Sequence, residues 1–197
     1  MNRRSPALQP VHGETGVLVH PGGDRRPAAE HWLSSAHPAP RRARAEWADH
    51  GVALLPLGTL FSAVRIPGRL VQAVAATTEA EEIDDFLDEF LGGGPVICDP
   101  RGPRYYALVP ASVPTTWRQA VDDWRRAADA DCLGRGTWLG VPRVGATEFD
   151  SRALAGYWAV AVSSPGLLCP PLTVARLIAA GVHRLSEGEG PWPGRWS

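Results

Sequence analysis

The stretch from Gly94 to Pro110 constrains the fold more than any other part of the sequence. It contains two apolar runs, 96–98 and 105–109, separated by a charged turn with proline and glycine. Short apolar runs bounded by such residues are typical of buried strands. The pattern therefore predicts two neighbouring strands joined by this turn. Asp99 ends the first strand, and a carboxylate at that position can hold a metal ion.

Two further apolar runs, 52–57 and 61–66, flank Gly58 and Thr59. This spacing predicts a hairpin whose second strand ends at Pro67, because glycine favours the turn and proline cannot continue the ladder. Strands are also expected at the runs 137–141 and 157–162.

Apolar residues at helical spacing predict three helices. The first covers 78–91 and stops at a run of three glycines, the second is capped by Thr116 and ends near Asp129, and the third follows Pro170 and Pro171. Strand pairs alternating with helices predict an α/β (α+β) domain, with a single mixed sheet covered by about three helices.

The length and composition favour one domain over 46–186, since 197 residues with 44% apolar content suit a single core. Residues 1–45 are rich in Pro, Arg, Ala and Gly and carry seven arginines against three acids, which predicts a disordered tail. A nucleic-acid-binding arm is the alternative interpretation of this segment. Residues 187–197 predict a flexible C-terminal tail.

The formal net charge of −1 excludes a bulk polycation, so any contact with nucleic acid must come from a local patch. All 20 basic residues are arginine, which supplies planar donors for phosphate. The three cysteines are widely spaced, which indicates reduced thiols and neither a disulfide framework nor a paired metal-ligand spacing. No apolar run reaches the length of a membrane span, so we expect a cytoplasmic protein without a membrane partner.

The predicted helix over 79–89 carries seven acidic residues. Such residues normally form the solvated face of an amphipathic helix, and this is the favoured interpretation. The alternative is a surface that binds a protein partner.

Asp129 and Asp131 form an Asp-x-Asp pair. On an extended chain both carboxylates would face the same way and could bind a metal, but the preceding residues favour a helix terminus.

Four tryptophans in the body of the chain could stack nucleic-acid bases, although their spacing favours the core; they are Trp117, Trp124, Trp138 and Trp158. Sequence motifs for serine hydrolases, P-loop proteins, zinc proteases and dinucleotide binding are absent.

In order, the central segments resemble the bifunctional DNA primase/polymerase domain of the archaeo-eukaryotic primase superfamily, in its small actinobacterial forms. Residues 96–100 resemble the strand that ends in acids in that family. Residues 101–110 are similar to its histidine-and-aromatic strand, with Arg104 in the place of the histidine. Residues 131–142 resemble its acid followed by a glycine-rich turn. The similarity in element order covers roughly 47–180.

This resemblance implies nucleotidyl transfer with two divalent metals, Mg²⁺ or Mn²⁺, held by carboxylates beside a basic phosphate-binding patch. The candidate metal ligands are Asp99 and Asp131, while no catalytic residue is assigned. The candidate nucleotide or nucleic-acid ligands are Arg101, Arg104, Arg135 and Arg143.

Because the family's second acid and its histidine are absent, the leading hypothesis is a degenerate domain that does not polymerise and retains weak nucleotide or nucleic-acid binding. The alternatives are a regulatory interaction module that uses the acidic helix, and an active metal-dependent nucleotidyltransferase.

Overall fold

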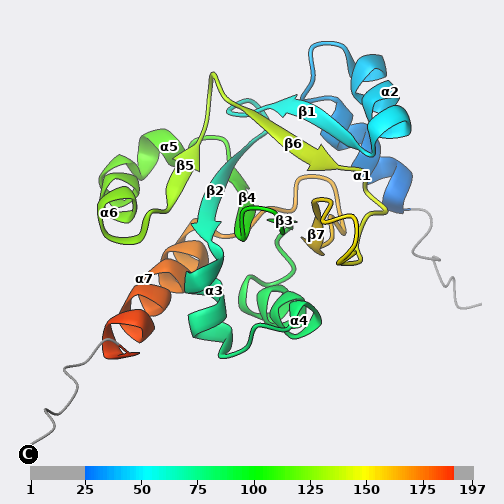
Figure 1. Cartoon of the computed structure of the whole chain (residues 1–197). Coiled ribbons are helices and arrows are strands. Elements are labelled where there is room, and N and C mark those ends of the chain that lie inside the picture. The colour runs from blue at the N-terminus through cyan, green and yellow to red at the C-terminus, as the bar shows by residue number, and fades with distance from the viewer. Residues whose placement is uncertain (1–24, 189–197) are drawn as a thin grey trace, which may run out of the picture.

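The computed structural model describes residues 25–188, which form two sheets and their covering helices (Figure 1). The larger sheet has five antiparallel strands in the order β5-β2-β4-β3-β7. Their bounds are Asp131–Leu133 for β5, Phe61–Pro67 for β2, Arg104–Pro110 for β4, Val96–Asp99 for β3 and Tyr157–Val160 for β7. The mixed α and β content predicted from the sequence is confirmed, but as two sheets and not one.

The second sheet is a two-stranded ribbon in which β1 (Val52–Pro56) pairs with β6 (Trp138–Pro142). Side chains alternate across it, so Ala53 and Leu55 are buried while Leu54 is exposed. Figure 1 shows this ribbon with the first two helices on one side of the molecule, away from the C-terminal helix.

Seven helices surround the sheets within the described part of the chain. They are α1 (Arg25–Ser34), α2 (Pro40–His50), α3 (Gly68–Ala75), α4 (Ala80–Phe90), α5 (Val113–Thr116), α6 (Arg118–Ala128) and α7 (Pro171–Gly188). None of them is long and apolar enough to cross a membrane.

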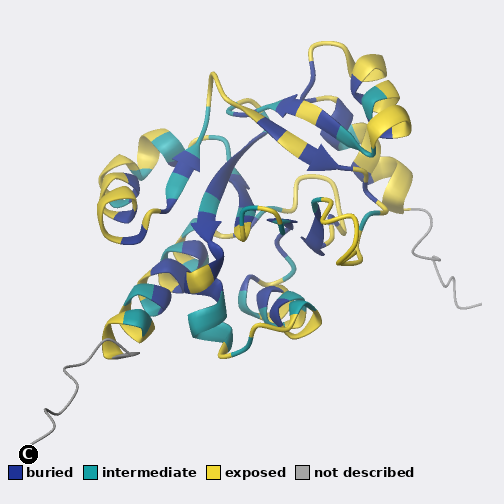
Figure 2. Cartoon of the chain, in the orientation of Figure 1, coloured by how far each residue is buried: buried dark blue, intermediate teal, exposed yellow. Residues whose placement is uncertain are grey.

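The five-stranded sheet separates two hydrophobic cores. One core lies under α3, α4, α6 and α7 and takes Val96 and Cys98 from β3. The other lies under α1, α2 and the ribbon and takes Ile97 from the same strand. Successive β3 side chains thus point to opposite faces, as a strand buried on both sides requires. Figure 2 shows the buried residues concentrated on the strands and on the helix faces turned toward them.

The predicted hairpin of 52–57 with 61–66 is wrong, because its two strands belong to different sheets. Strand β2 is buried along nearly its whole length, as expected for a strand between two neighbours, whereas β1 alternates between buried and exposed positions. Strand β1 instead pairs with residues more than 80 positions later in the chain. Proximity in sequence therefore suggested the wrong partner.

The predicted disorder of residues 1–45 is wrong for 25–45, which form α1 and most of α2. Three of the five buried residues of these helices are small (Ala29, Ser34 and Ala43), and the other two are Leu33 and Trp47. The indole N–H of Trp47 also donates a hydrogen bond to the Val141 carbonyl at 2.8 Å. Because alanine is small and common in this chain, its helical spacing was hidden by the composition. Residues 1–24 and 189–197 lie outside the described residues.

The sequence patterns also missed α3 and β5. Helix α3 begins directly after Pro67, which was interpreted only as the end of a strand. Strand β5 has three residues and lies at the edge of the sheet, so its apolar pattern is too short to recognise.

Candidate functional site

Polar side chains from four adjacent strands share one face of the five-stranded sheet. In one row across the sheet, Asp131 pairs with Arg65, Arg65 with Tyr106, and Tyr106 with Ile97. In a second row, Arg104 pairs with Asp99. Because Ile97 belongs to the core beneath the ribbon, side-chain alternation places all these residues on the ribbon side of the sheet. We call this the polar strip; it consists of Asp99, Arg104, Tyr106, Arg65 and Asp131.

The two candidate metal ligands lie at opposite ends of the polar strip. Strands β3 and β5 are separated by β4 and β2, which corresponds to about 14 Å at the usual strand spacing. Carboxylates that share a divalent ion must lie within roughly 5 Å of one another. Asp99 and Asp131 therefore do not form the shared metal site that the sequence suggested. No group of three or more His, Cys, Asp or Glu residues within 25–188 could hold a metal ion.

The Asp131 carboxylate already has two donors. Its Oδ1 accepts hydrogen bonds from the Arg125 guanidinium at 2.8 Å and from the Cys132 N–H at 2.8 Å. Asp129 caps the end of α6 in a left-handed conformation with φ of 54°, so the favoured interpretation of the Asp-x-Asp pair as a helix terminus is confirmed. Both aspartates thus have structural roles at the α6–β5 connection.

The structure brings together only part of the predicted basic patch. Arg101 and Arg104 are exposed in the turn and strand that follow Asp99, and the Asp99 Oδ1 accepts the Arg101 N–H at 3.1 Å. Arg135 lies in the β5–β6 turn with its backbone against Gly58. Arg143 follows β6, where its N–H donates to the Gly51 carbonyl.

Sequence reasoning missed Arg65 in the polar strip. It is the only charged residue of β2, an otherwise buried strand. That isolated charge in an apolar run was the available signal, since a charged residue in a central strand needs a polar environment.

A pocket of about 460 Å³ adjoins the Asp99 end of the polar strip. Its polar lining comes from His50, Asp99, Arg101 and Tyr106, and Gly140 of the ribbon forms part of its wall. A carboxylate, an imidazole, a guanidinium and a phenol therefore surround one space. We call it the strip pocket.

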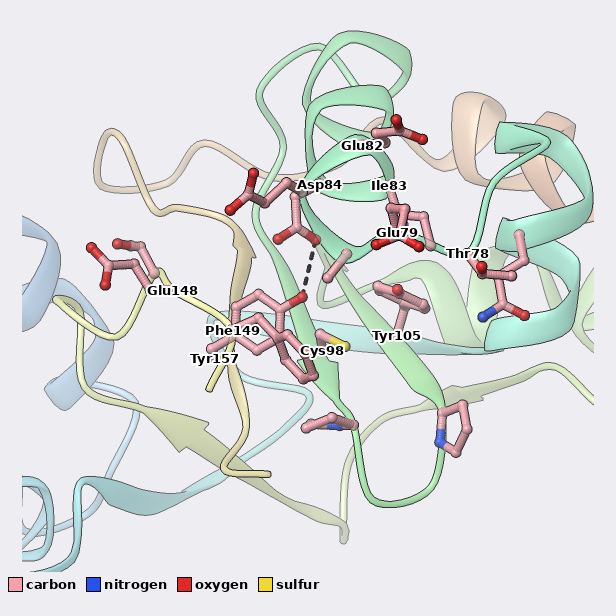
Figure 3. Close-up of a pocket in the computed structure, with 16 residues that line it drawn as sticks. Thr78, Glu79, Glu82, Ile83, Asp84, Cys98, Tyr105, Glu148, Phe149 and Tyr157 are labelled. Carbon is pink, nitrogen blue, oxygen red and sulfur yellow. Dashed lines mark hydrogen bonds between the residues drawn. The ribbon is translucent and has the colours of Figure 1, made fainter. Parts of the chain in front are cut away.

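A larger pocket of about 900 Å³ lies on the opposite face of the sheet, beside α4 (Figure 3). Cys98 and Tyr105 from β3 and β4 line it together with Tyr157 from β7. The first half of α4 and the loop 147–149 supply carboxylates, including Asp84 and Glu148. We call this the acidic pocket.

Burial shifts the pKa values of the groups in the acidic pocket. Desolvation raises the pKa of Asp84 to about 7, and the nearby charges of Asp85 and Glu81 act in the same direction. The Tyr157 hydroxyl opposes this shift by donating a hydrogen bond to the Asp84 Oδ1 at 3.2 Å. Desolvation also raises the pKa of the Cys98 thiol to about 11, so this cysteine is not a thiolate nucleophile at neutral pH.

Asp84→Asn is expected to stabilise the protein above pH 7 and to have little effect near pH 4. Because the pKa of Asp84 is near 4 in the unfolded chain and about 7 in the fold, ionisation opposes folding increasingly as the pH rises between these values. A shift of three units corresponds to about 4 kcal/mol, but Asp84 is partly open to solvent, so we expect about 1–2 kcal/mol. Urea unfolding at pH 5 and pH 8 measures the gain. Asp88→Asn, at an exposed position of α4, is the control, and an equal gain there would contradict the assignment.

The four tryptophans do not form a stacking platform. Trp124 and Trp158 are buried, and Trp117 packs against the same core as Trp124. Only Trp138 is largely open, with 53% of its surface exposed on the outer face of the ribbon.

No protein-family model, curated protein or solved structure matches this chain. The functional proposals therefore rest on the geometry of the chain itself.

Proposed function

We propose that the polar strip and the strip pocket bind a phosphate-bearing ligand, either a nucleotide or nucleic acid, and that the domain does not polymerise. The observation that carries this proposal is the common face of Arg65, Arg104 and Asp99. Guanidinium groups recognise phosphate oxygens with paired donors, and a neighbouring carboxylate can accept hydrogen bonds from a sugar hydroxyl or a base amine.

The arginines of this region are available to a ligand. Within residues 25–188, none of Arg65, Arg101 and Arg104 forms an ion pair with a carboxylate. Tyr106 adds an aromatic ring beside Arg65 in the first row, and such rings stack on bases with little sequence preference.

Polymerisation is not part of this proposal, because the two carboxylates that would hold the metals lie on strands separated by two others. The resemblance to primase/polymerase domains remains a prediction that bears on ancestry. That resemblance implies a nucleotide or nucleic acid as the ligand, which agrees with the arginines of the polar strip, since guanidinium groups bind phosphate.

Arg104→Ala is expected to weaken the binding of ATP and of a labelled single-stranded DNA about tenfold at low salt, because each phosphate contact by a charged donor contributes about 1.5 kcal/mol or more. For the DNA, the slope of log affinity against log salt concentration should also become shallower by about one, because one phosphate contact is lost. Fluorescence anisotropy measures DNA binding, and calorimetry measures ATP binding. Binding should survive EDTA, since no metal pair is required.

Arg184→Ala removes an exposed arginine from α7 and serves as the matched control. If the wild-type protein bound neither probe, or if both variants lost the same affinity, the polar strip would not be the binding site.

A further inference from the structure

The floor of the acidic pocket consists of side chains from three neighbouring strands and from α4 (Figure 3). Cys98 of β3, Tyr105 of β4 and Tyr157 of β7 are buried, and Asp84 of α4 points toward Tyr157. Because Cys98 and Asp99 point to opposite faces of the sheet, this floor is separate from the polar strip.

The Tyr105 hydroxyl is a buried polar group without a strong partner. The residue is only 6% exposed, and its hydroxyl makes no hydrogen bond to an oxygen or nitrogen of residues 25–188. Every fully enclosed side-chain oxygen or nitrogen in that part of the chain has a partner, so the Tyr105 oxygen must open into the pocket that this residue lines. The polar group beside it is the Cys98 thiol, which hydrogen-bonds only weakly. A ligand that supplies the missing partner therefore gains binding free energy.

Asp84 is a second group with unused hydrogen-bonding capacity. Its Oδ1 accepts a hydrogen bond from the Tyr157 hydroxyl at 3.2 Å, whereas its Oδ2 has no donor among the described residues. Desolvation raises the pKa of Asp84 to about 7, because the ionised form lacks the stabilisation that water would give it. An N–H donor at Oδ2 supplies part of that stabilisation.

The other acids of the lining do not belong to the floor. All four are exposed, so water solvates their carboxylates and they offer no fixed contact to a ligand. They are Glu79, Glu81, Glu82 and Glu148. Because no basic residue lines the pocket, their combined charge disfavours an anionic ligand in the same space.

Apolar and aromatic surface flanks the floor. The buried side chain of Ile83 and the rings of Pro100 and Pro103 line the pocket. Phe149 lies against Tyr157, with ring centroids 5.8 Å apart. Such walls suit a planar ring, whose faces contact apolar surface while its edge forms hydrogen bonds.

We propose that the floor of the acidic pocket binds a neutral planar molecule through an amide edge, whose C=O accepts a hydrogen bond from Tyr105 and whose N–H donates to Asp84. Carboxamides and lactam rings share this edge. Tyr105 and Asp84 both lie beside the Cys98 thiol, so one ligand can reach both groups. The pocket volume of about 900 Å³ also leaves room for a larger molecule that carries the edge.

Calorimetric titration of the full chain with nicotinamide and with uracil tests the proposal. Nicotinamide presents a carboxamide and uracil a lactam, and neither carries a phosphate group, so the result is independent of phosphate binding at the polar strip. We expect saturable binding of at least one ring, and the tighter one identifies the form of the amide edge. Tyr105→Phe removes only the hydroxyl and should weaken this binding about fivefold to tenfold, and Asp84→Ala should weaken it about tenfold.

Matched ligands test the amide edge itself. N,N-dimethylnicotinamide and 1,3-dimethyluracil stay neutral but lack the N–H donor, and nicotinate replaces the amide by a carboxylate. Each should bind about tenfold more weakly than its parent ring, because the hydrogen bond to Asp84 is lost. Equal affinity for nicotinamide and nicotinate would overturn the proposal.

Asp88→Ala is the control variant, because it removes a carboxylate from an exposed position of the same helix outside the pocket. Three further results would overturn the proposal: no saturable binding of either ring, unchanged affinity in Tyr105→Phe, or equal losses in Asp88→Ala and Asp84→Ala. Tyr105→Phe keeps the aromatic ring in the core, so this variant decides the question even if Asp84→Ala fails to fold.

Discussion

Trp158→Ala is expected to lower the free energy of unfolding by about 3–5 kcal/mol, the range found for removing a large aromatic side chain from a core. The Trp158 side chain is 1% exposed and belongs to the core beneath the ribbon. Its indole N–H donates to the Pro142 carbonyl at 3.2 Å, so the variant leaves both a cavity and an acceptor without its donor. Urea unfolding followed by circular dichroism measures the loss.

Two further variants separate packing from hydrogen bonding. Trp158→Phe keeps an aromatic ring in the core but loses the indole donor, so we expect a smaller loss of about 1–2 kcal/mol. Trp138→Ala removes the same residue type from a position that is 53% exposed, and should cost less than about 1 kcal/mol. Comparable losses for Trp138→Ala and Trp158→Ala would contradict the burial of Trp158.

Trp158 also connects the core to the acidic pocket. Its backbone N–H donates to the Ala146 carbonyl, directly before the loop that carries Glu148 and Phe149. The adjacent residue Tyr157 points to the other side of the sheet and donates to Asp84. Loss of the Trp158 side chain should therefore disturb the rim of the pocket as well as the core.

The sequence was most informative where the physical signal is local. Strands β3 and β4 were predicted from continuous apolar runs bounded by glycine and proline, and both are confirmed with antiparallel pairing. Helix α4 was predicted from Ile83 and Leu87 at helical spacing, and both side chains are buried while most of its acids are exposed. In each case the residues that determine the element lie within one stretch of chain.

The candidate sites depended on information that the sequence patterns do not contain. Asp99 is followed by a turn as expected, whereas Asp131 begins β5, a strand that was not predicted. The strand order places β4 and β2 between the two aspartates. The acidic pocket is lined by residues from α4 and from the loop 147–149, segments that lie more than 50 residues apart in the sequence. Neither arrangement follows from local spacing, because strand order and loop placement are set by the packing of the whole domain.

Strands β3 and β4 contribute side chains both to the polar strip and to the acidic pocket. Asp99 and Arg104 belong to the polar strip, whereas Cys98 and Tyr105, their immediate neighbours in sequence, line the acidic pocket on the other face of the sheet. Strand alternation makes this possible, since a shift of one residue changes the face. A change of register between β3 and β4 would therefore affect both sites at once.

Gly58→Ala is expected to destabilise the protein by about 2–5 kcal/mol. Gly58 has a φ of +86°, and a Cβ at this position would lie 2.4 Å from the backbone nitrogen of Arg135. The left-handed conformation costs a non-glycine residue about 1–2 kcal/mol, and an overpacked contact with backbone adds about 1–3 kcal/mol. Because Gly58 joins the ribbon to the five-stranded sheet, the β5–β6 turn must move to relieve the clash.

Gly136→Ala provides a matched control in that same β5–β6 turn. Gly136 has a φ of +88°, nearly equal to that of Gly58, but no atom lies within 4 Å of its Cβ position. It should therefore show only the conformational cost of about 1–2 kcal/mol, and the difference between the two variants measures the steric contact. Equal losses of stability from the two substitutions would mean that the Arg135 backbone moves away from the new methyl group at position 58 without a cost in free energy. In that case the close approach of the ribbon to the sheet at Gly58 would not help to hold the two together.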